Sequence, residues 1–131
     1  MQADFLLAVG GGSVIDTAKA IAMELAEKGR DIWDLYENKR EAKACLPVGS
    51  ILTIAAAGSE SSSASVLTND ETKEKRGYES DLCRPKFAIM NPEWMYSLPD
   101  YQTQSGCVDI MMHTMERYSL RAAIWHYRCI G

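Results

Sequence analysis

The segment at residues 105–118, SGCVDIMMHTMERY, carries a carboxylate and an imidazole that could bind a metal together. Asp109 and His113 are four residues apart, so a helix would place both on one face with roughly 5–6 Å between their Cβ atoms. A carboxylate oxygen and an imidazole nitrogen can share one cation, and this pair of donors suits Fe(II) or Zn(II). The pair is incomplete, because a catalytic metal usually takes about three protein ligands. The alternative is a solvated helix face, on which Asp109, His113 and Glu116 lie opposite methionines of a core.

A second candidate site is a glycine triplet that joins an apolar run to a helix-like pattern. The glycines at residues 10–12 let the backbone turn tightly, and the unpaired N–H groups of the following helix favour a phosphate. The GxGxxG dinucleotide fingerprint is only partly met, because Ile15 stands where the third glycine belongs; a variant loop is therefore favoured. Ser13 and Asp16 also fit a capping box, which needs no ligand, so both interpretations stay open.

The elements that must position these groups follow an α/β order. Apolar runs at residues 5–9, 46–54 and 86–90 predict three strands, buried as in a parallel sheet. Residues 65–68 and 76–80 flank a charged stretch and favour a hairpin. A helix is expected at residues 13–28, with an apolar face of Val14, Ala18, Ile21 and Leu25 beside Ile15 and Ala22. A short helical turn is expected at residues 31–36. A long helix is expected from Asp100 onward, with an apolar face of Val108, Met111, Met112, Met115 and Tyr118.

Composition and charge are those of a globular domain. The chain has 131 residues, 47% hydrophobic and 24% charged, which is enough for one domain with a core. The net charge of −4 gives no basic surface of the kind that binds nucleic acid. No run approaches the roughly 18 apolar residues of a membrane helix. We see no signal peptide. Cys45, Cys83, Cys107 and Cys129 form no CxxC pair, so we expect reduced thiols in the cytoplasm.

Four motifs in this order resemble the iron-containing (group III) alcohol dehydrogenases, especially the butanol-dehydrogenase-like branch. They are GGGSVIDTAKAIA at 10–22, LPVGSILTIAAAGSE at 46–60, KFAIMNPEWMYSLP at 86–99 and QTQSGCVDIMMHTMERY at 102–118. The chain departs from the family pattern TTxxGTGSE, because Ile54 and Ala57 replace threonines. The resemblance ends after Tyr118, and no ligand role is carried over to His126.

The resemblance implies a division of the chain into two parts. In the family, an N-terminal α/β dinucleotide-binding domain is followed by an all-α metal-binding domain, and the active site lies between them. Residues 1–98 would form part of the parallel-sheet dinucleotide-binding domain. Residues 99–131 would form the truncated start of the helical metal-binding domain, so the chain would be an internal fragment.

The resemblance also implies roles for individual residues. Asp109 and His113 would be catalytic residues that bind Fe2+ or Zn2+. For NAD(P), Gly11, Gly12 and Ser13 would bind the pyrophosphate, and Asp16 would lie near the nicotinamide side. Thr53 and Ser59 would line the cofactor cleft. Lys75 would approach the ribose, and Leu98 would pack near the cofactor.

The implied activity is hydride transfer between nicotinamide and a small primary alcohol or aldehyde, butanol-like, with a metal that polarises the substrate oxygen. We expect the chain alone to be a poor enzyme or none, because the family's remaining two metal ligands are histidines of the later helical domain. A homo-oligomer is one assembly that the family allows. The alternatives are a non-catalytic nucleotide-binding or structural remnant, and a dehydrogenase with another substrate, such as glycerol.

Overall fold

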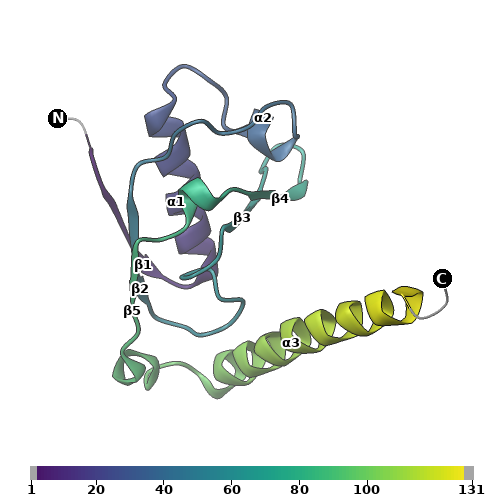
Figure 1. Cartoon of the computed structure of the whole chain (residues 1–131). Helices are drawn as coiled ribbons and strands as arrows, with labels where there is room; N and C mark the ends of the chain where they lie inside the picture. Colours follow the sequence, from purple (N-terminus) through teal and green to yellow (C-terminus); the bar gives the residue numbers. More distant parts are fainter. Residues whose placement is uncertain (1–2, 129–131) are drawn as a thin grey trace.

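The computed structural model describes residues 3–128 and, within them, the side chains of residues 3–119. The elements follow the expected α/β order (Figure 1). No helix in the described part is long and apolar enough to cross a bilayer. The elements are β1 (Leu6–Gly10), α1 (Gly12–Ala26), α2 (Trp33–Tyr36), β2 (Val48–Leu52), β3 (Ala64–Thr68), β4 (Lys75–Glu79), the short 3₁₀ helix η1 (Asp81–Cys83), β5 (Phe87–Ile89), the 3₁₀ helix η2 (Pro92–Met95) and α3 (Asp100–Arg128).

The central sheet has three parallel strands in the order β1-β2-β5. β1 pairs with β2 from Leu6 opposite Val48 to Gly10 opposite Leu52. Because the strands are parallel, their carboxyl ends meet at the same edge of the sheet. The glycine triplet after β1 and the loop after β2 therefore leave the sheet side by side.

One face of the sheet is covered by α1, and the main core lies between them. The core residues are Ile15, Ala18 and Ala22 of α1 with Ala8, Val48 and Leu52 of the sheet. The three residues from α1 follow the i, i+3, i+7 spacing of a single helical stripe. Two of them are alanines, which let the helix approach the sheet closely.

The predicted apolar face of α1 is partly wrong. Val14 and Ile21 remain 47% and 42% exposed, and Leu25 is also exposed. The physical reason is the free edge of β1. Val14 and Ile21 flank a groove of about 460 Å³ beside that edge, where no described strand pairs with β1.

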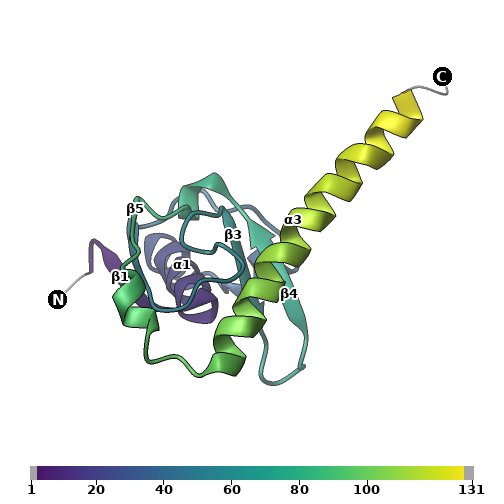
Figure 2. The same ribbon diagram turned by 90° about the horizontal axis from the view of Figure 1, so that it is seen from below.

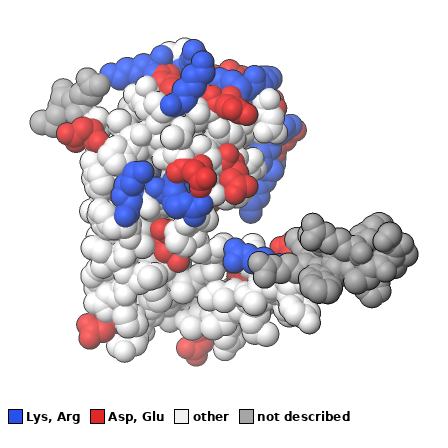
Figure 3. Space-filling model, in the orientation of Figure 1, with Lys and Arg blue, Asp and Glu red and all other residues white. Residues whose placement is uncertain are grey.

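The prediction of strands buried on both faces is also wrong for β1 and for β5, in which Phe87 and Ile89 are both 45% exposed. Leu7 and Val9 are 50% and 55% exposed on the face of the sheet that α1 does not cover. On the same face, the ring of Phe5 stacks on that of Phe87, with centroids 6.0 Å apart. A parallel sheet needs helices on both faces to be fully buried, and the described part of the chain supplies one. This side of the molecule is largely uncharged in Figure 3.

The predicted hairpin is confirmed: β3 and β4 pair antiparallel and form a separate two-stranded sheet. Its Leu67 and Tyr78 pack against a second core that α1, α2 and η1 supply, made of Ala20, Met23, Leu35, Tyr36 and Cys83. The Tyr36 hydroxyl lies 2.7 Å from Ser65 Oγ, and Ala42 N donates to Tyr78 Oη at 2.8 Å. α1 is therefore held between two sheets.

α3 passes beneath this body and extends beyond it (Figures 1 and 2). It approaches the body closely at Gly106, where a Cβ would collide with the carbonyl oxygen of Ala55. The expected methionine face of α3 is exposed to solvent, because Met111, Met112 and Met115 are all more than half exposed. Cys45, Cys83 and Cys107 are free thiols, whereas Cys129 lies outside the described residues.

Candidate functional site

The glycine triplet begins α1 without help from a side chain. Gly11 is the N-cap, and its carbonyl accepts hydrogen bonds from Val14 N and Ile15 N, both at 3.1 Å. No side chain caps the helix, and its first turn contains no acidic residue. The capping-box interpretation of Ser13 and Asp16 is therefore wrong, and the backbone N–H groups of Gly12 and Ser13 at the start of the helix are left for another acceptor.

The loop after β2 lies directly against the glycine triplet. Thr53 N donates to Gly10 O at 3.1 Å. A Cβ added to Gly11 would lie 2.5 Å from Ile54 Cγ2, and one added to Gly12 would lie 3.2 Å from Ser59 Oγ. The structure thus brings together the glycine loop, Thr53 and Ser59.

Asp16 is buried and turned toward the hairpin. Its Oδ2 accepts a hydrogen bond from Val66 N at 3.0 Å, while its backbone carbonyl accepts one from Ser65 Oγ at 2.8 Å. Its Oδ1 makes no hydrogen bond and lies 3.7 Å from Lys19 Nζ. One side of this carboxylate is thereby committed to holding β3 against α1.

Lys19 belongs to the same polar contact, although we assigned it no role from the sequence. Its side chain is fully buried, and its Nζ donates to Ser62 O at 3.0 Å and Ala64 O at 2.6 Å. Burial lowers the pKa of Lys19, and the nearby Asp16 carboxylate acts in the opposite direction. A sequence signal did exist, because position 19 is the i+4 member of the buried stripe that begins at Ile15.

The carboxylate and imidazole of α3 lie on one face, as their spacing predicts. His113 Nε2 is 3.7 Å from Asp109 Oδ1, and both side chains are nearly half exposed. His113 Nδ1 is 4.0 Å from Glu116 Oε2. Among the side chains that the structure describes, no group of three or more histidine, cysteine or acidic residues is placed to hold a metal ion.

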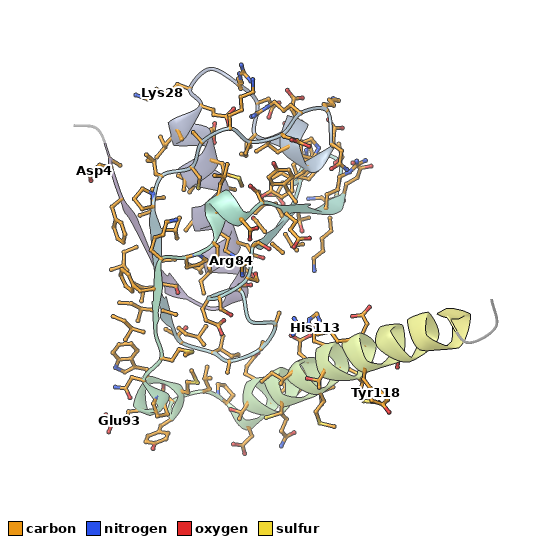
Figure 4. All side chains as sticks on the ribbon, viewed as in Figure 1. Asp4, Lys28, Arg84, Glu93, His113 and Tyr118 are labelled. Carbon is orange, nitrogen blue, oxygen red and sulfur yellow. The ribbon has the colours of Figure 1, made fainter. Side chains whose placement is uncertain are left out.

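His113 faces the body of the protein across a pocket of about 510 Å³. Figure 4 shows its side chain on the side of α3 that faces the body, with Arg84 across from it and Tyr118 on the opposite side of the helix. The pocket is lined from the body by Ala56, Ala57, Gly58, Ser61, Ser62 and Ser63, and from α3 by Ile110, His113, Thr114 and Arg117.

The loop after β2 therefore touches both candidate sites. We call residues 54–64 the bridging loop. Ser59 of this loop packs on Gly12, and Gly58 lines the pocket that contains His113. Asp109 instead lines a smaller hollow of about 370 Å³ on α3 with Met112.

Lys75 and Leu98 are not brought to the glycine loop by any hydrogen bond of the described residues. Lys75 is exposed at the start of β4, in register with Thr68. It belongs to the hairpin that Asp16 holds through Val66, two residues before Thr68. Leu98 is half-buried between η2 and α3, where its N–H donates to Met95 O at 3.1 Å.

Comparison with known proteins places these features in a family. Residues 1–92 match the family model described as iron-containing alcohol dehydrogenase. The chain is 52% identical over 115 residues to the probable NADH-dependent butanol dehydrogenase 1 of Bacillus subtilis, covering 88% of this chain and 30% of that protein. It is 40% identical over 116 residues to the NADPH-dependent aldehyde reductase YqhD of Escherichia coli, covering 87% and 30%.

Solved structures agree with the sequence comparison. The NADH-dependent butanol dehydrogenase A of Thermotoga maritima matches with a TM-score of 0.83 and 42% sequence identity, covering 86% of this chain and 28% of that one. The chain thus spans about 30% of the length of the curated relatives it matches. The glycine loop, the parallel sheet and the family match lead to one conclusion: the chain belongs to the iron-containing alcohol dehydrogenase family.

Proposed function

We propose that this chain supplies the cofactor-binding part and two metal ligands of an NAD(P)-dependent alcohol dehydrogenase that acts on small primary alcohols or aldehydes. The observation that carries the proposal is the position of the bridging loop, which packs on Gly12 at one point and lines the pocket of His113 at another. The named activities of the relatives, butanol dehydrogenase and aldehyde reductase, support the substrate class.

The glycine loop fits a dinucleotide pyrophosphate. α1 has no side-chain cap and no acidic residue in its first turn, so its N-terminal N–H groups favour an anion. Gly11 and Gly12 have no Cβ, and the bridging loop already occupies the space where a Cβ would lie. In the proposal, Gly11, Gly12 and Ser13 bind the phosphates, and Thr53 and Ser59 form the wall of the cleft.

The other proposed cofactor contacts come from the hairpin, the inner face of α1 and the start of α3. Lys75 is exposed on β4 and free to extend toward a ribose, and Leu98 offers an apolar contact. Asp16 would act near the nicotinamide side by positioning, because its Oδ2 holds β3 and its buried Oδ1 lies 3.7 Å from Lys19 Nζ.

Asp109 and His113 fit a hard or borderline metal such as Fe2+ or Zn2+, because they offer one oxygen and one nitrogen from adjacent turns. They would form half of a metal site, and the other ligands would come from a helical domain beyond residues 99–131. When bound, the metal supplies Lewis-acid stabilisation of an alkoxide oxygen and NAD(P) supplies the hydride chemistry. Residues 1–98 accordingly form the partial dinucleotide-binding domain of this proposal.

The chain's own residues bind and orient in this mechanism. The first turn of α1 would fix the cofactor phosphates, and Ser59 would keep the bridging loop seated over Gly12. The bridging loop would also limit the access of water to the space between Gly12 and His113. Three free thiols suit a reducing compartment, so a cytoplasmic location is part of the same proposal.

The experiment is titration of the purified chain with NADH and, separately, with Co2+ or Zn2+. We expect saturable NADH binding, and weak metal binding that is lost in Asp109→Ala. Asp70→Ala, which removes an exposed carboxylate from the turn between β3 and β4, is the control and should bind metal as wild type does. Absence of NADH binding would contradict the proposal. NADH binding without metal binding would favour the alternative, a non-catalytic nucleotide-binding remnant. That alternative has some support, because the described residues place only two candidate ligands together.

A further inference from the structure

Among the side chains that the structure describes, the amino group of Lys19 is the most completely buried charged group, and it is surrounded by hydrogen-bond acceptors. Its side chain is 0% exposed. Nζ donates to Ser62 O at 3.0 Å, Ser62 Oγ at 3.2 Å and Ala64 O at 2.6 Å. An ammonium group has three N–H donors and no acceptor, so this arrangement uses its full hydrogen-bonding capacity.

All these acceptors belong to the end of the bridging loop, more than 40 residues away in the sequence. The loop makes few backbone hydrogen bonds of its own: Ser61 N and Ser62 N both donate to Gly58 O, closing one turn. At the end of the loop, Ser80 N donates to Ser63 O at 3.0 Å. Among the described residues, the backbone of the turn at residues 58–62 makes no such bond to the rest of the chain, so its position depends on side chains that reach it from elsewhere.

Three other side chains reach the bridging loop. Arg84 donates to Ser61 O at 2.6 Å from the exposed surface, Cys83 Sγ donates to Ser63 O at 3.2 Å, and Glu79 Oε1 accepts from Ser63 Oγ at 2.9 Å. Lys19 differs from these three because it extends from α1, the helix that begins at the glycine loop. It links the bridging loop to the same rigid element that carries Gly12.

We propose that Lys19 is a positioning residue of the cofactor cleft: its buried amino group holds the bridging loop on α1, so that Ser59 packs on Gly12 and Gly58 lines the pocket of His113. The inference rests on the proposed function in so far as the cleft binds NAD(P). It assigns to Lys19 no contact with cofactor or substrate.

The chemistry of the surroundings makes Lys19 hard to replace. Removing its amino group would take the donor from Ser62 O and leave Ala64 O with only the longer hydrogen bond from Ser62 Oγ, at 3.3 Å, in a partly buried site. Asp16 Oδ1 would lose the cation 3.7 Å away that offsets its burial. Both changes loosen the segment between α1 and β3 and leave the core of Ile15 and Ala22 in place.

The test compares Lys19→Met with Lys28→Met, which makes the same chemical change at an exposed lysine just beyond α1. Hydrogen–deuterium exchange and NADH titration are measured on the full chain. In Lys19→Met we expect the amides of residues 58–64 to exchange at least tenfold faster, with those of β2 unchanged, and NADH to bind at least tenfold more weakly. Lys28→Met should match wild type in both measurements.

A second pair of variants keeps the test decisive if Lys19→Met does not fold. Ser62→Ala removes one acceptor of Lys19, whereas Ser97→Ala makes the same chemical change at an exposed serine outside the bridging loop. We expect Ser62→Ala to weaken NADH binding severalfold and to speed exchange at residues 58–64, with Ser97→Ala close to wild type.

The inference is overturned if Lys19→Met binds NADH as wild type does, or if it loses exchange protection uniformly across the core. The same two outcomes in Ser62→Ala decide the question if Lys19→Met does not fold. If wild type itself does not bind NADH, the proposed function fails and the exchange measurement decides whether Lys19 positions the loop. Local loss of protection at residues 58–64 then supports the positioning role, and unchanged protection refutes it.

Discussion

Ser59 lies directly over Gly12, so close that a Cβ on the glycine would come within 3.2 Å of the serine Oγ. The two residues are 47 positions apart and meet because β1 and β2 are parallel neighbours whose carboxyl ends share one edge of the sheet. The helix start that favours an anion and the loop that reaches His113 are thereby joined in one place.

The contact between Gly11 and Ile54 predicts coupling between these two positions. A Cβ on Gly11 would lie 2.5 Å from Ile54 Cγ2, so Gly11→Ala must displace the isoleucine. We expect Gly11→Ala to destabilise the fold by about 1–3 kcal/mol and to weaken NADH binding. Ile54→Ala should restore part of the loss, because it vacates the space that the new methyl group needs.

A double-mutant cycle measured by urea unfolding checks this prediction. We expect an interaction free energy of at least about 0.5 kcal/mol, typical of residues in contact. Gly29→Ala is a useful comparison, since Gly29 has open space around it and any effect there comes from its φ of +83°. Strictly additive effects at Gly11 and Ile54 would contradict the packing described here.

Tyr36 and Cys45 predict a loss of stability at alkaline pH. Burial raises the pKa of Tyr36 to about 12 and that of Cys45 to about 11. The unfolded chain releases these protons at lower pH than the native chain, so the free energy of unfolding decreases as pH rises from 9 to 12. Lys19, whose pKa burial lowers, opposes the trend, because its native form loses its proton first.

Tyr36→Phe isolates the tyrosine in that trend. At neutral pH it should cost about 1 kcal/mol through the lost hydrogen bond to Ser65. Between pH 10 and 12 its stability should decrease less steeply than that of wild type. Chemical unfolding at several pH values measures both effects. Tyr101→Phe is the control, since Tyr101 is 75% exposed; equal slopes for wild type and Tyr36→Phe would disprove the assignment.

Glu27 predicts a contribution to stability that disappears in acid. Backbone N–H groups of Lys43 and Ala44, together with Arg40, hold the pKa of Glu27 below its usual 4.5. A carboxylate with a lowered native pKa stabilises the fold above pH 4.5 and loses that effect as pH decreases through its native pKa. Glu27→Gln should therefore cost about 1.5–3 kcal/mol near neutral pH.

The same substitution should flatten the acid limb of the stability curve, because Gln does not titrate. Thermal unfolding between pH 2 and 7 provides the measurement. Glu24→Gln serves as the control, since Glu24 is an exposed residue of α1. An acid transition that is identical in wild type and Glu27→Gln would show that other carboxylates govern it.

The methionines of α3 predict binding of hydrophobic dyes. Met111 and Met115 are 60% and 57% exposed, and they add to an apolar surface that also includes the open face of the sheet. Met111→Lys with Met115→Lys should reduce the fluorescence of bound ANS while changing the unfolding free energy by no more than about 0.5 kcal/mol. Glu116→Lys adds charge at a polar position of α3 and should leave ANS fluorescence unchanged. Undiminished fluorescence in the double variant would place the dye site elsewhere.

Local sequence was enough to predict most elements. The change from an apolar run to period-3.6 spacing at residues 5–22 predicted β1, the glycine turn and α1. The spacing of Asp109 and His113 predicted one shared helix face, and their atoms lie 3.7 Å apart. These features depend on backbone preferences and on residues a few positions apart, which a single sequence contains directly.

Tertiary structure decided which faces are buried and which residues meet across the chain. The stripe of Ile15, Ala18 and Ala22 packs on the sheet, while Val14 remains at the surface because no described strand covers the edge of β1. Asp16 proved to bind the hairpin rather than to cap α1.

By itself, then, the sequence determined the order of the elements, the glycine loop and the paired donors of α3, since each follows from local periodicity and spacing. Only the fold decided that Lys19 lies buried against Ser62 and that the bridging loop meets both sites. Those contacts join residues more than 40 positions apart, and they form where packing of α1 between two sheets leaves buried polar groups that must find partners.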